Sequence, residues 1–265
     1  MRLSKESILI GIGIVAGGSA ILAAAGVFVF TQPIWSDGGS SQSPAVDAAR
    51  LETHTKKFSE EFVPRNWTHT ENLNRAASYI HDEFARAGAP AVQYQVYAMD
   101  GGTYRNVMVQ FGPDSKDAVI VGAHYDAFGE LPGADDNASG VAGLIELAHL
   151  LGRTKLQTRV ELVAFTLEEP KTREGDGLFR SEYGGSAVHV RSLKERGISP
   201  RVFINLEMIG YFSDEDGSQS YPVGLFRSLY PSRGDFIGII GRIGQGRTVR
   251  RVKAAMRAAS ALPVY

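Results

Sequence analysis

The sequence predicts an α/β fold, a three-layer α/β/α sandwich around a mostly parallel mixed sheet, preceded by one N-terminal transmembrane helix. Three features predict it. An uncharged apolar run stands near the start of the chain, short runs rich in Val, Ile or Phe follow, and segments with helical spacing separate the later runs. Buried strands that alternate with helices are typical of a sheet covered by helices on both faces.

The uncharged run covers residues 8–30 and is 23 residues long. A helix needs about 20 apolar residues to cross a bilayer core, so we predict a membrane anchor whose partner is the lipid bilayer. The alternative is a cleavable signal peptide, with a cleavage site at the three alanines of residues 23–25, but the apolar run continues beyond them. Arg2 and Lys5 precede the run and Asp37 is the first charge after it, which predicts a cytoplasmic N-terminus and an extracytoplasmic domain.

After the anchor, residues 1–31, we expect a flexible Gly/Ser linker over residues 32–47 and a globular domain over residues 48–265. The composition, 43% hydrophobic and 22% charged, is that of an ordinary globular protein. A net charge of −1 offers no basic surface for nucleic acid. The glycines at positions 11, 13 and 17 resemble a dinucleotide fingerprint, but they lie inside the apolar run, so we expect no nucleotide.

The globular domain opens with a predicted helix, whose spaced apolar residues run from Leu73 to Phe84 and which ends at Gly88. Four short apolar runs then predict buried strands, and two helical patterns separate the later ones. The strands are expected at residues 107–111, 118–123, 160–166 and 202–206, and the helices at residues 139–151 and 185–196. In such sheets the binding site lies at the carboxyl ends of the strands.

Six residues with side chains that can bind a metal ion lie close together in the predicted fold. They follow three of these strands or lie in the loop after the second strand. They are His124, Asp126, Asp136, Glu168, Glu169 and Glu207. Taken singly, each has an ordinary explanation as a helix cap, a strand exit or a buried histidine. Together, carboxylates converging on one sheet edge would repel each other unless a cation lay among them. The chain has no cysteine, so with N and O ligands zinc is the first choice, and manganese or cobalt are chemically admissible.

Four motifs, GAHYD, GADDNASG, TLEEP and NLEMIGYF, occur in this order. Their combination resembles the co-catalytic zinc aminopeptidases of metallopeptidase family 28, similar to bacterial leucyl aminopeptidase, over about residues 73–235. The resemblance implies the zinc exopeptidase fold, two Zn²⁺ ions per site, and peptide substrates with a free N-terminus. It also implies hydrolysis of the N-terminal peptide bond through a metal-activated water and a Glu general base.

The resemblance also implies a role for each motif residue. His124 would bind one zinc, Asp136 would bridge both, and Glu169 would bind the other. Glu168 would be the general base. Glu207 would complete the first zinc's ligands, at a position where the family usually has Asp, and its side chain is one methylene longer.

Asp126 lies two residues along the strand from His124, and therefore on the same side of it. We expect it to serve catalysis by orienting the imidazole, the alternative being an ordinary surface acid. The other five histidines have no motif around them, and we expect them to be structural; they are His54, His69, His81, His149 and His189.

The family's second zinc also takes a histidine from late in the domain, after the segment that matches residues 231–241 here. No histidine follows His189 in this chain, so we expect a domain incomplete at its C-terminus, an incomplete second zinc site, and low or no activity. Two other functions stay open. One is a non-catalytic ectodomain of the same fold, and the other is a glutaminyl cyclase-like acyl transferase, which uses one zinc.

Overall fold

The computed structural model describes residues 5–34, 45–172 and 181–265, with side chains from residue 18 onward. Most of the predicted linker, residues 35–44, lies outside the described residues. The contacts divide the chain into two compact units. One is Pro44–Tyr211, and the other joins Met1–Ser43 to Phe212–Tyr265.

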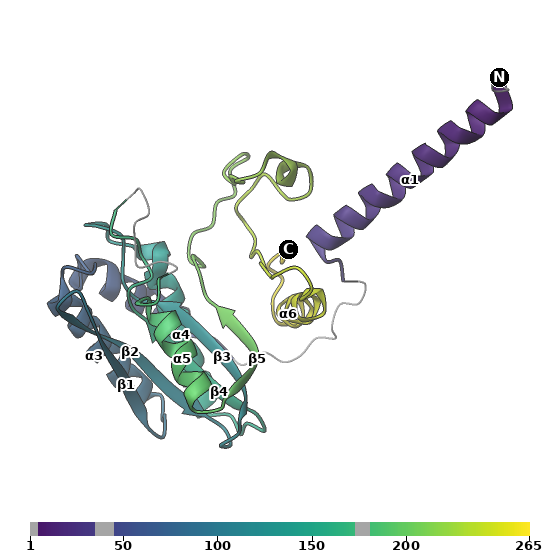
Figure 1. Cartoon of the computed structure of the whole chain (residues 1–265). Helices are drawn as coiled ribbons and strands as arrows, with labels where there is room; N and C mark the ends of the chain where they lie inside the picture. The colour runs from purple at the N-terminus through teal and green to yellow at the C-terminus, as the bar shows by residue number, and fades with distance from the viewer. Residues whose placement is uncertain (1–4, 35–44, 173–180) are drawn as a thin grey trace. The chain divides into compact units, whose positions relative to one another are not determined.

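The unit Pro44–Tyr211 contains a five-stranded sheet with the strand order β1-β2-β4-β3-β5 (Figure 1). The strands are β1 (Val92–Met99), β2 (Gly102–Phe111), β3 (Asp117–His124), β4 (Arg159–Phe165) and β5 (Ser199–Asn205). The three strands β3, β4 and β5 are parallel, whereas β1 pairs with β2 and β2 with β4 in antiparallel fashion. The sheet is therefore mixed, as expected, but its pairings are not mostly parallel.

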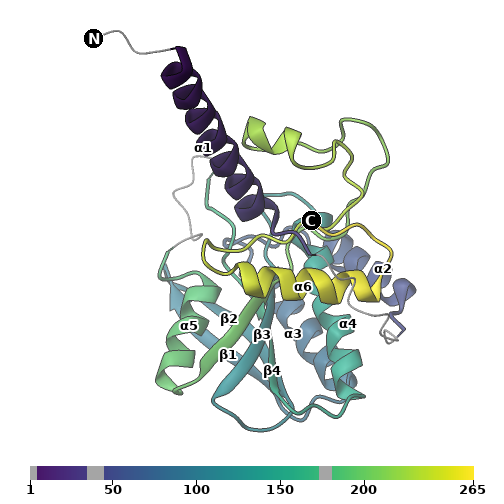
Figure 2. The ribbon, with the colours of Figure 1, turned by 90° about the vertical axis from the view of Figure 1, so that its right-hand side faces the viewer.

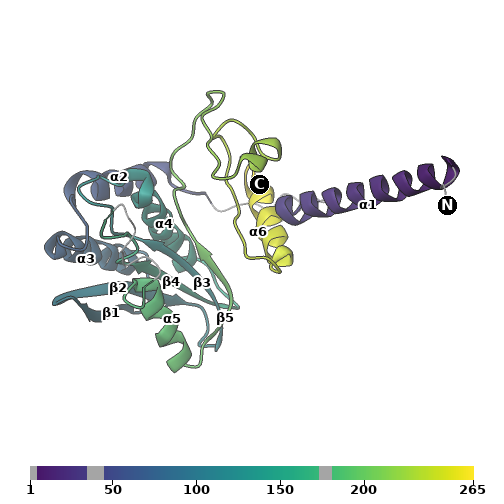
Figure 3. The ribbon, with the colours of Figure 1, turned by 45° about the horizontal axis from the view of Figure 1, so that its top comes forward.

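Helices cover both faces of this sheet (Figures 2 and 3). They are α3 (Thr70–Arg86), α4 (Gly140–Gly152) and α5 (Gly185–Glu195), and α2 (Ala48–Lys56) packs against α4. The larger core cluster joins α3 and α4 to one face and includes Ile80 and Leu144. The smaller cluster joins α5 to the other face through Leu193. The unit is thus a three-layer α/β/α sandwich.

Helix α3 confirms the helix predicted from apolar spacing. Its buried face includes Leu73, Ile80 and Phe84. Gly88 follows the helix with a φ of +80°, a conformation that glycine adopts without steric cost. The amide of Ala89 then donates to the carbonyl of Phe84, which closes the helix end.

The outer strands differ from the sequence expectation. The four predicted strands correspond to β2 to β5, but the residue pattern did not reveal β1, whose side chains are mostly exposed or half-buried. Strand β5 was expected to be buried, yet it is an outer strand and Phe203 in it is 49% exposed. The inner strands β3 and β4 are buried along nearly their whole length, and the inner strand β2 is buried mainly in its second half.

The second unit contains α1 (Lys5–Thr31), the short 3₁₀ helix η3 (Gly224–Ser228) and α6 (Gly246–Ala259). Lys253 of α6 is buried, and its ammonium group donates to the carbonyl of Thr31 at 2.7 Å. The predicted anchor falls within α1, but the side chains of residues 5–17 lie outside the described part. Among the described residues, none of the helices combines the length and apolar character needed to span a bilayer.

Candidate metal centre

The parallel strands bring the predicted site residues to one edge of the sheet. Gly122 in β3 is in register with Val163 in β4 and with Asn205 in β5. The three strands therefore end side by side. His124 ends β3, the two glutamates follow β4, and Glu207 follows β5.

The imidazole of His124 lies at the centre of the resulting cluster and is 1% exposed. Its Nε2 atom is 3.1 Å from Oδ1 of Asp136, 3.3 Å from Oε1 of Glu207 and 3.9 Å from Oε2 of Glu168. Ligand atoms of His124, Asp136 and Glu169 all lie within 4.8 Å of one another. The structure thus brings together all five of these residues, and they form one cluster rather than two separate sets.

Asp126 is also buried, and it contacts both strand ends. One carboxylate oxygen, Oδ1, lies 3.4 Å from Nδ1 of His124, which is long for a strong hydrogen bond. The other, Oδ2, accepts hydrogen bonds at 2.9 Å from the backbone amides of Glu168 and Glu169. Asp126 therefore lies beside His124, where its role in orienting the imidazole stays a prediction, and it holds the backbone of the two glutamates.

At two strand exits, an unusual backbone conformation stands beside the acidic residues. Leu167, which is fully buried, has a φ of +60° and precedes Glu168. Met208 has a φ of +48° and follows Glu207. Positive φ is rare for residues other than glycine, and it often occurs at functional sites. Both residues stand directly beside a carboxylate that faces His124.

The loop Ala134–Ser139, assigned as η2, carries Asp136 and is tied to the loop that follows β5. Asn137 is fully buried, and its side chain donates to the carbonyl of Leu206 at 2.8 Å and accepts from the amide of Met208 at 3.3 Å. Asp135 accepts from the amide of Gly210 at 2.8 Å. These contacts fix the position of Asp136 relative to Glu207.

Sequence reasoning did not assign roles to Asp135 and Asn137. Both lie inside the GADDNASG motif, so the motif itself was the available signal. Their hydrogen bonds join segments about 70 residues apart, and no local pattern shows which carbonyl or amide a polar side chain will meet.

The cluster contains more negative than positive charge. Burial, together with the neighbouring carboxylates, raises the pKa of Glu168 to about 7 and that of Glu169 to about 8. Burial alone would lower the pKa of His124, but the carboxylates of Asp126, Asp136 and Glu207 beside its ring outweigh burial and raise that pKa well above its usual range. Imidazole and carboxylate are the ligands that zinc takes in proteins without cysteine, so the residues present fit a zinc site.

The other histidines have partners elsewhere, which agrees with structural roles. His54 lies 2.7 Å from the hydroxyl of Tyr79, and His149 faces Glu83 at 3.9 Å. His189 is 3.1 Å from Glu161. Neither His149 nor His189 belongs to the group of described residues that could hold a metal.

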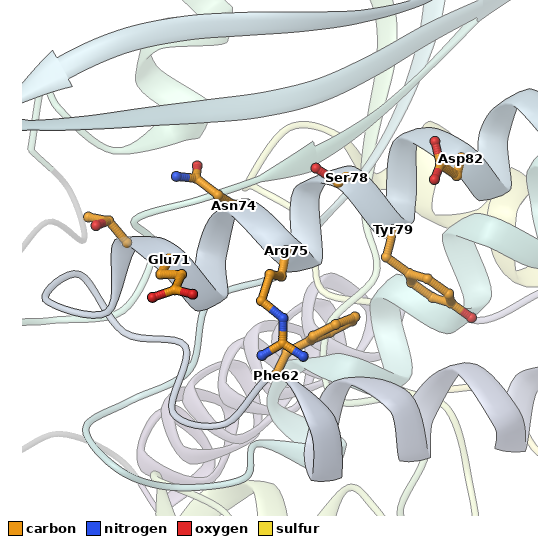
Figure 4. Close-up of a pocket in the computed structure, with 8 residues that line it drawn as sticks. Phe62, Glu71, Asn74, Arg75, Ser78, Tyr79 and Asp82 are labelled. Carbon is orange, nitrogen blue, oxygen red and sulfur yellow. The ribbon is translucent and has the colours of Figure 1, made fainter.

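Two open hollows on this unit lie away from the cluster. The first, of about 650 Å³, runs along α3 and is lined in part by Phe62, Arg75 and Tyr79 (Figure 4). The second is lined in part by Arg159 and Arg196. Neither is lined by a residue of the carboxylate cluster, so the candidate chemistry belongs to the strand ends.

Comparison with known proteins gives matches over the same region. The model of the family described as Peptidase family M28 matches residues 106–226, which include all six cluster residues. The chain is 41% identical over 247 residues to the uncharacterized protein YfbL of Escherichia coli (strain K12), covering 90% of this chain and 73% of that protein. It is 34% identical over 100 residues to a probable leucine aminopeptidase 2 of Arthroderma benhamiae, covering 37% of this chain and 18% of the fungal protein.

Among solved structures, the chain is similar to the glutaminyl cyclase of Bacteroides thetaiotaomicron, whose structure contains N-acetylhistamine. The TM-score is 0.55 at 25% identity, and the alignment covers 65% of each chain. The chain therefore spans less than two thirds of that cyclase.

Proposed function

Because the chain belongs to peptidase family M28, we propose that it is a zinc-dependent aminopeptidase, which hydrolyses the N-terminal peptide bond of peptides. One observation carries the proposal. His124, Asp136 and Glu169 offer ligand atoms within 4.8 Å of one another. Glu168 lies beside them, 3.9 Å from His124, and is not needed as a metal ligand. That arrangement supplies both a metal site and a proton acceptor.

Zinc would be held by His124, Asp136, Glu169 and Glu207. Bound there, zinc supplies Lewis-acid chemistry, because it polarises a carbonyl group and lowers the pKa of water towards 7. Asp136 is the residue suited to bridging two ions, since its carboxylate lies within 4.8 Å of ligand atoms of both His124 and Glu169. We propose one tightly held ion, on His124, Asp136 and Glu207, and weaker binding of a second.

Glu168 acts as the general base. Its carboxylate takes a proton from the attacking water and returns it to the departing amine, which a carboxylate can do because it accepts in one step and donates in the next. Without a metal, burial raises the pKa of Glu168 to about 7, and a zinc ion beside it would lower that pKa, which leaves the carboxylate ionised and able to accept a proton. Asp126 keeps the glutamate in place through the backbone amides of Glu168 and Glu169.

The test is to measure metal content per chain together with hydrolysis of a panel of aminoacyl amides. We expect bound zinc and release of the free amine from at least one amide. Zinc binding without turnover on any amide would instead indicate a non-catalytic ectodomain. The metal-to-chain ratio also decides whether the second ion binds.

A second candidate function is glutaminyl cyclisation, which the similarity to the Bacteroides thetaiotaomicron cyclase favours. Glu207, one methylene longer than the Asp usual in the aminopeptidases, also fits this alternative. A peptide with N-terminal glutamine separates the two activities. Cyclisation releases ammonia and leaves the peptide bonds intact, whereas an aminopeptidase releases free glutamine.

We further propose that α1 anchors the protein in a membrane, with the N-terminus cytoplasmic and the peptidase unit outside. The support is the uncharged run of residues 8–30 and the two basic residues before it. Membrane fractionation of the full chain tests this. Recovery of a soluble mature protein that begins after Ala25 would show a cleaved signal peptide instead.

A further inference from the structure

Arg65 is a buried cation next to the carboxylate cluster, and neither the motifs nor the proposed chemistry uses it. It lies between α2 and α3 in the sequence and is 0% exposed. Burying a guanidinium group costs several kcal/mol unless hydrogen bonds and nearby charges compensate. So large a cost at one position requires a specific explanation.

All four hydrogen bonds of the guanidinium group go to backbone carbonyls. Nε donates to Tyr125 at 2.9 Å, and Nη2 donates to Gly133 at 2.6 Å. Nη1 donates to Pro132 at 2.5 Å and to Phe58 at 3.0 Å. Tyr125 directly follows His124, and residues 132 and 133 directly precede the loop that carries Asp136.

The chain is closely packed around the guanidinium group at Gly133. Gly133 has a φ of +53°, and a methyl group on it would lie 2.3 Å from the carbonyl oxygen of Asp136 and 2.7 Å from Nη2 of Arg65. The backbone of Arg65 is also fixed, because its carbonyl accepts from the amide of Ala127 at 3.1 Å. Arg65 therefore joins the segment after β3 to the start of the η2 loop, by both main chain and side chain.

We infer that Arg65 is a positioning residue of the metal centre, which sets the separation of His124 and Asp136 by holding the carbonyls of Tyr125, Pro132 and Gly133. The inference rests on the proposed metal site but not on peptide hydrolysis. Its charge cannot be the reason for zinc binding, because a fixed cation near the site repels a metal ion. The fork of donors is the feature that serves the site, and lysine cannot reproduce it.

The positive charge of Arg65 should weaken zinc binding, whereas its positioning of the two loops should strengthen it. Because the two effects on zinc affinity are opposite, a variant can distinguish them. Arg65→Met removes the charge and the donors while keeping a long side chain. If charge dominated, this variant would bind zinc more tightly than the wild type. If positioning dominates, it binds zinc about 10- to 100-fold more weakly, the usual loss when a residue supporting the ligands is removed. Arg65→Lys, which keeps the charge, should also bind more weakly.

The experiment measures zinc affinity of the full chain by competition with a chromophoric chelator, on samples shown by circular dichroism to be folded. The matched control is Arg159→Lys. Arg159 is a second buried arginine, but it pairs with Asp114 and Glu161 at the start of β4. We expect this control to lose stability and keep wild-type zinc affinity.

If the wild type binds zinc and folded Arg65→Met binds it equally or more tightly, this inference is overturned and the proposed function is not. A wild-type chain that binds no zinc would overturn both this inference and the proposed function. Zinc binding without turnover would sink only the peptidase assignment. If Arg65→Met does not fold in chelator, folded Arg65→Lys carries the test instead, because rescue of folding by zinc would follow from mass action alone. Wild-type zinc affinity in folded Arg65→Lys would then overturn the inference.

Discussion

Acidic residues at the two ends of strand β4 have very different surroundings. Glu161, near its start, is 0% exposed and faces Arg159 at 2.9 Å, Arg196 at 3.1 Å and His189 at 3.1 Å. Glu168 and Glu169, just after its end, face other carboxylates and share one histidine with them. The first acid is neutralised by the chain's own cations, and the others are not.

The electrostatic outcome is opposite at the two places. Burial alone would raise the pKa of Glu161, but His189, Arg196 and Arg159 outweigh it and lower that pKa to about 2. Burial and like charges raise the pKa values of Glu168 and Glu169 to about 7 and about 8. The same fold can therefore pair a buried acid completely, and at the strand ends it does not. The shortage of positive charge there is what a metal ion would supply.

Among substitutions of these acidic residues, we expect the largest effect from one at Glu168, and the quantity affected is turnover. Glu168→Gln keeps the size of the side chain but removes the proton acceptor, so the rate should fall about 10³-fold, within the range for general-base catalysis. Zinc affinity should stay near the wild-type value. Steady-state hydrolysis of an aminoacyl amide and chelator competition measure the two quantities. Full activity in this variant would remove Glu168 from the mechanism.

At the paired acid, the expected effect is on stability instead. Glu161→Gln leaves Arg159 and Arg196 without their buried counter-charge, and we expect the free energy of unfolding to fall by about 3 kcal/mol. Urea unfolding of the full chain measures it. Asp114→Asn is the matched control, because Asp114 pairs with the same Arg159 but its side chain is 93% exposed. The control should change stability by less than about 1 kcal/mol. Equal losses of unfolding free energy in both variants would show that the buried charge of Glu161 is not specially important for stability.

Zinc binding should respond to Asp136 in particular. Asp136→Asn removes a ligand charge, and we expect zinc affinity to fall about 100-fold, which corresponds to about 2.7 kcal/mol. Asp135→Asn, one residue earlier, is the control. Asp135 accepts from the backbone amides of Gly210 and Tyr211 rather than facing His124, so its variant should lose much less affinity. A larger loss in the Asp135 variant would show that the two neighbours have been assigned the wrong way round.

The sequence predicted the layers and the position of the site because both depend on strong local signals. Apolar spacing revealed α3 and the strands β2 to β5. The strand β1 was missed because the prediction relied on continuous apolar runs, whereas VQYQVYAM alternates polar and apolar residues, as a half-exposed outer strand does. Strand β5 was correctly placed but wrongly expected to be buried, since its Val and Phe residues do not reveal that it is an outer strand.

Within the site, the sequence located the ligands but not the residues that hold them. His124, Asp136 and Glu169 stand in recognisable motifs and do gather at one sheet edge. Arg65 and Asn137 act through backbone carbonyls that lie about 60 to 70 residues away along the chain. Such contacts depend on how loops meet in space, and residue type alone does not specify them. The positive φ values of Leu167 and Met208 are likewise set by the strand exits and not by propensity.

The smallest effect we expect is on the pH dependence of stability, where the two groups have opposite signs. In chelated protein, Glu168 and Glu169 bind protons more tightly when folded than when unfolded, since their pKa values of about 7 and about 8 exceed the unfolded value of about 4.3. The free energy of unfolding should therefore fall as the pH rises from about 5 to 8. Glu161 has the opposite sign, because its contribution is present above the unfolded pKa and is lost as the pH falls towards 2.

Urea unfolding from pH 5 to 8.5, with chelator and with zinc, measures the first of these slopes. Solvent screening of the half-buried glutamates should keep it to about 1 kcal/mol across the range. The difference between the wild type and Glu169→Gln isolates the part of the slope that depends on Glu169, because His54 and His149, whose pKa values burial lowers, titrate alike in both proteins. Zinc should abolish the slope by holding the carboxylates ionised. If chelated wild type instead gained stability relative to Glu169→Gln as the pH rose, the strand-end acids would already be paired, and the case for a metal there would fail.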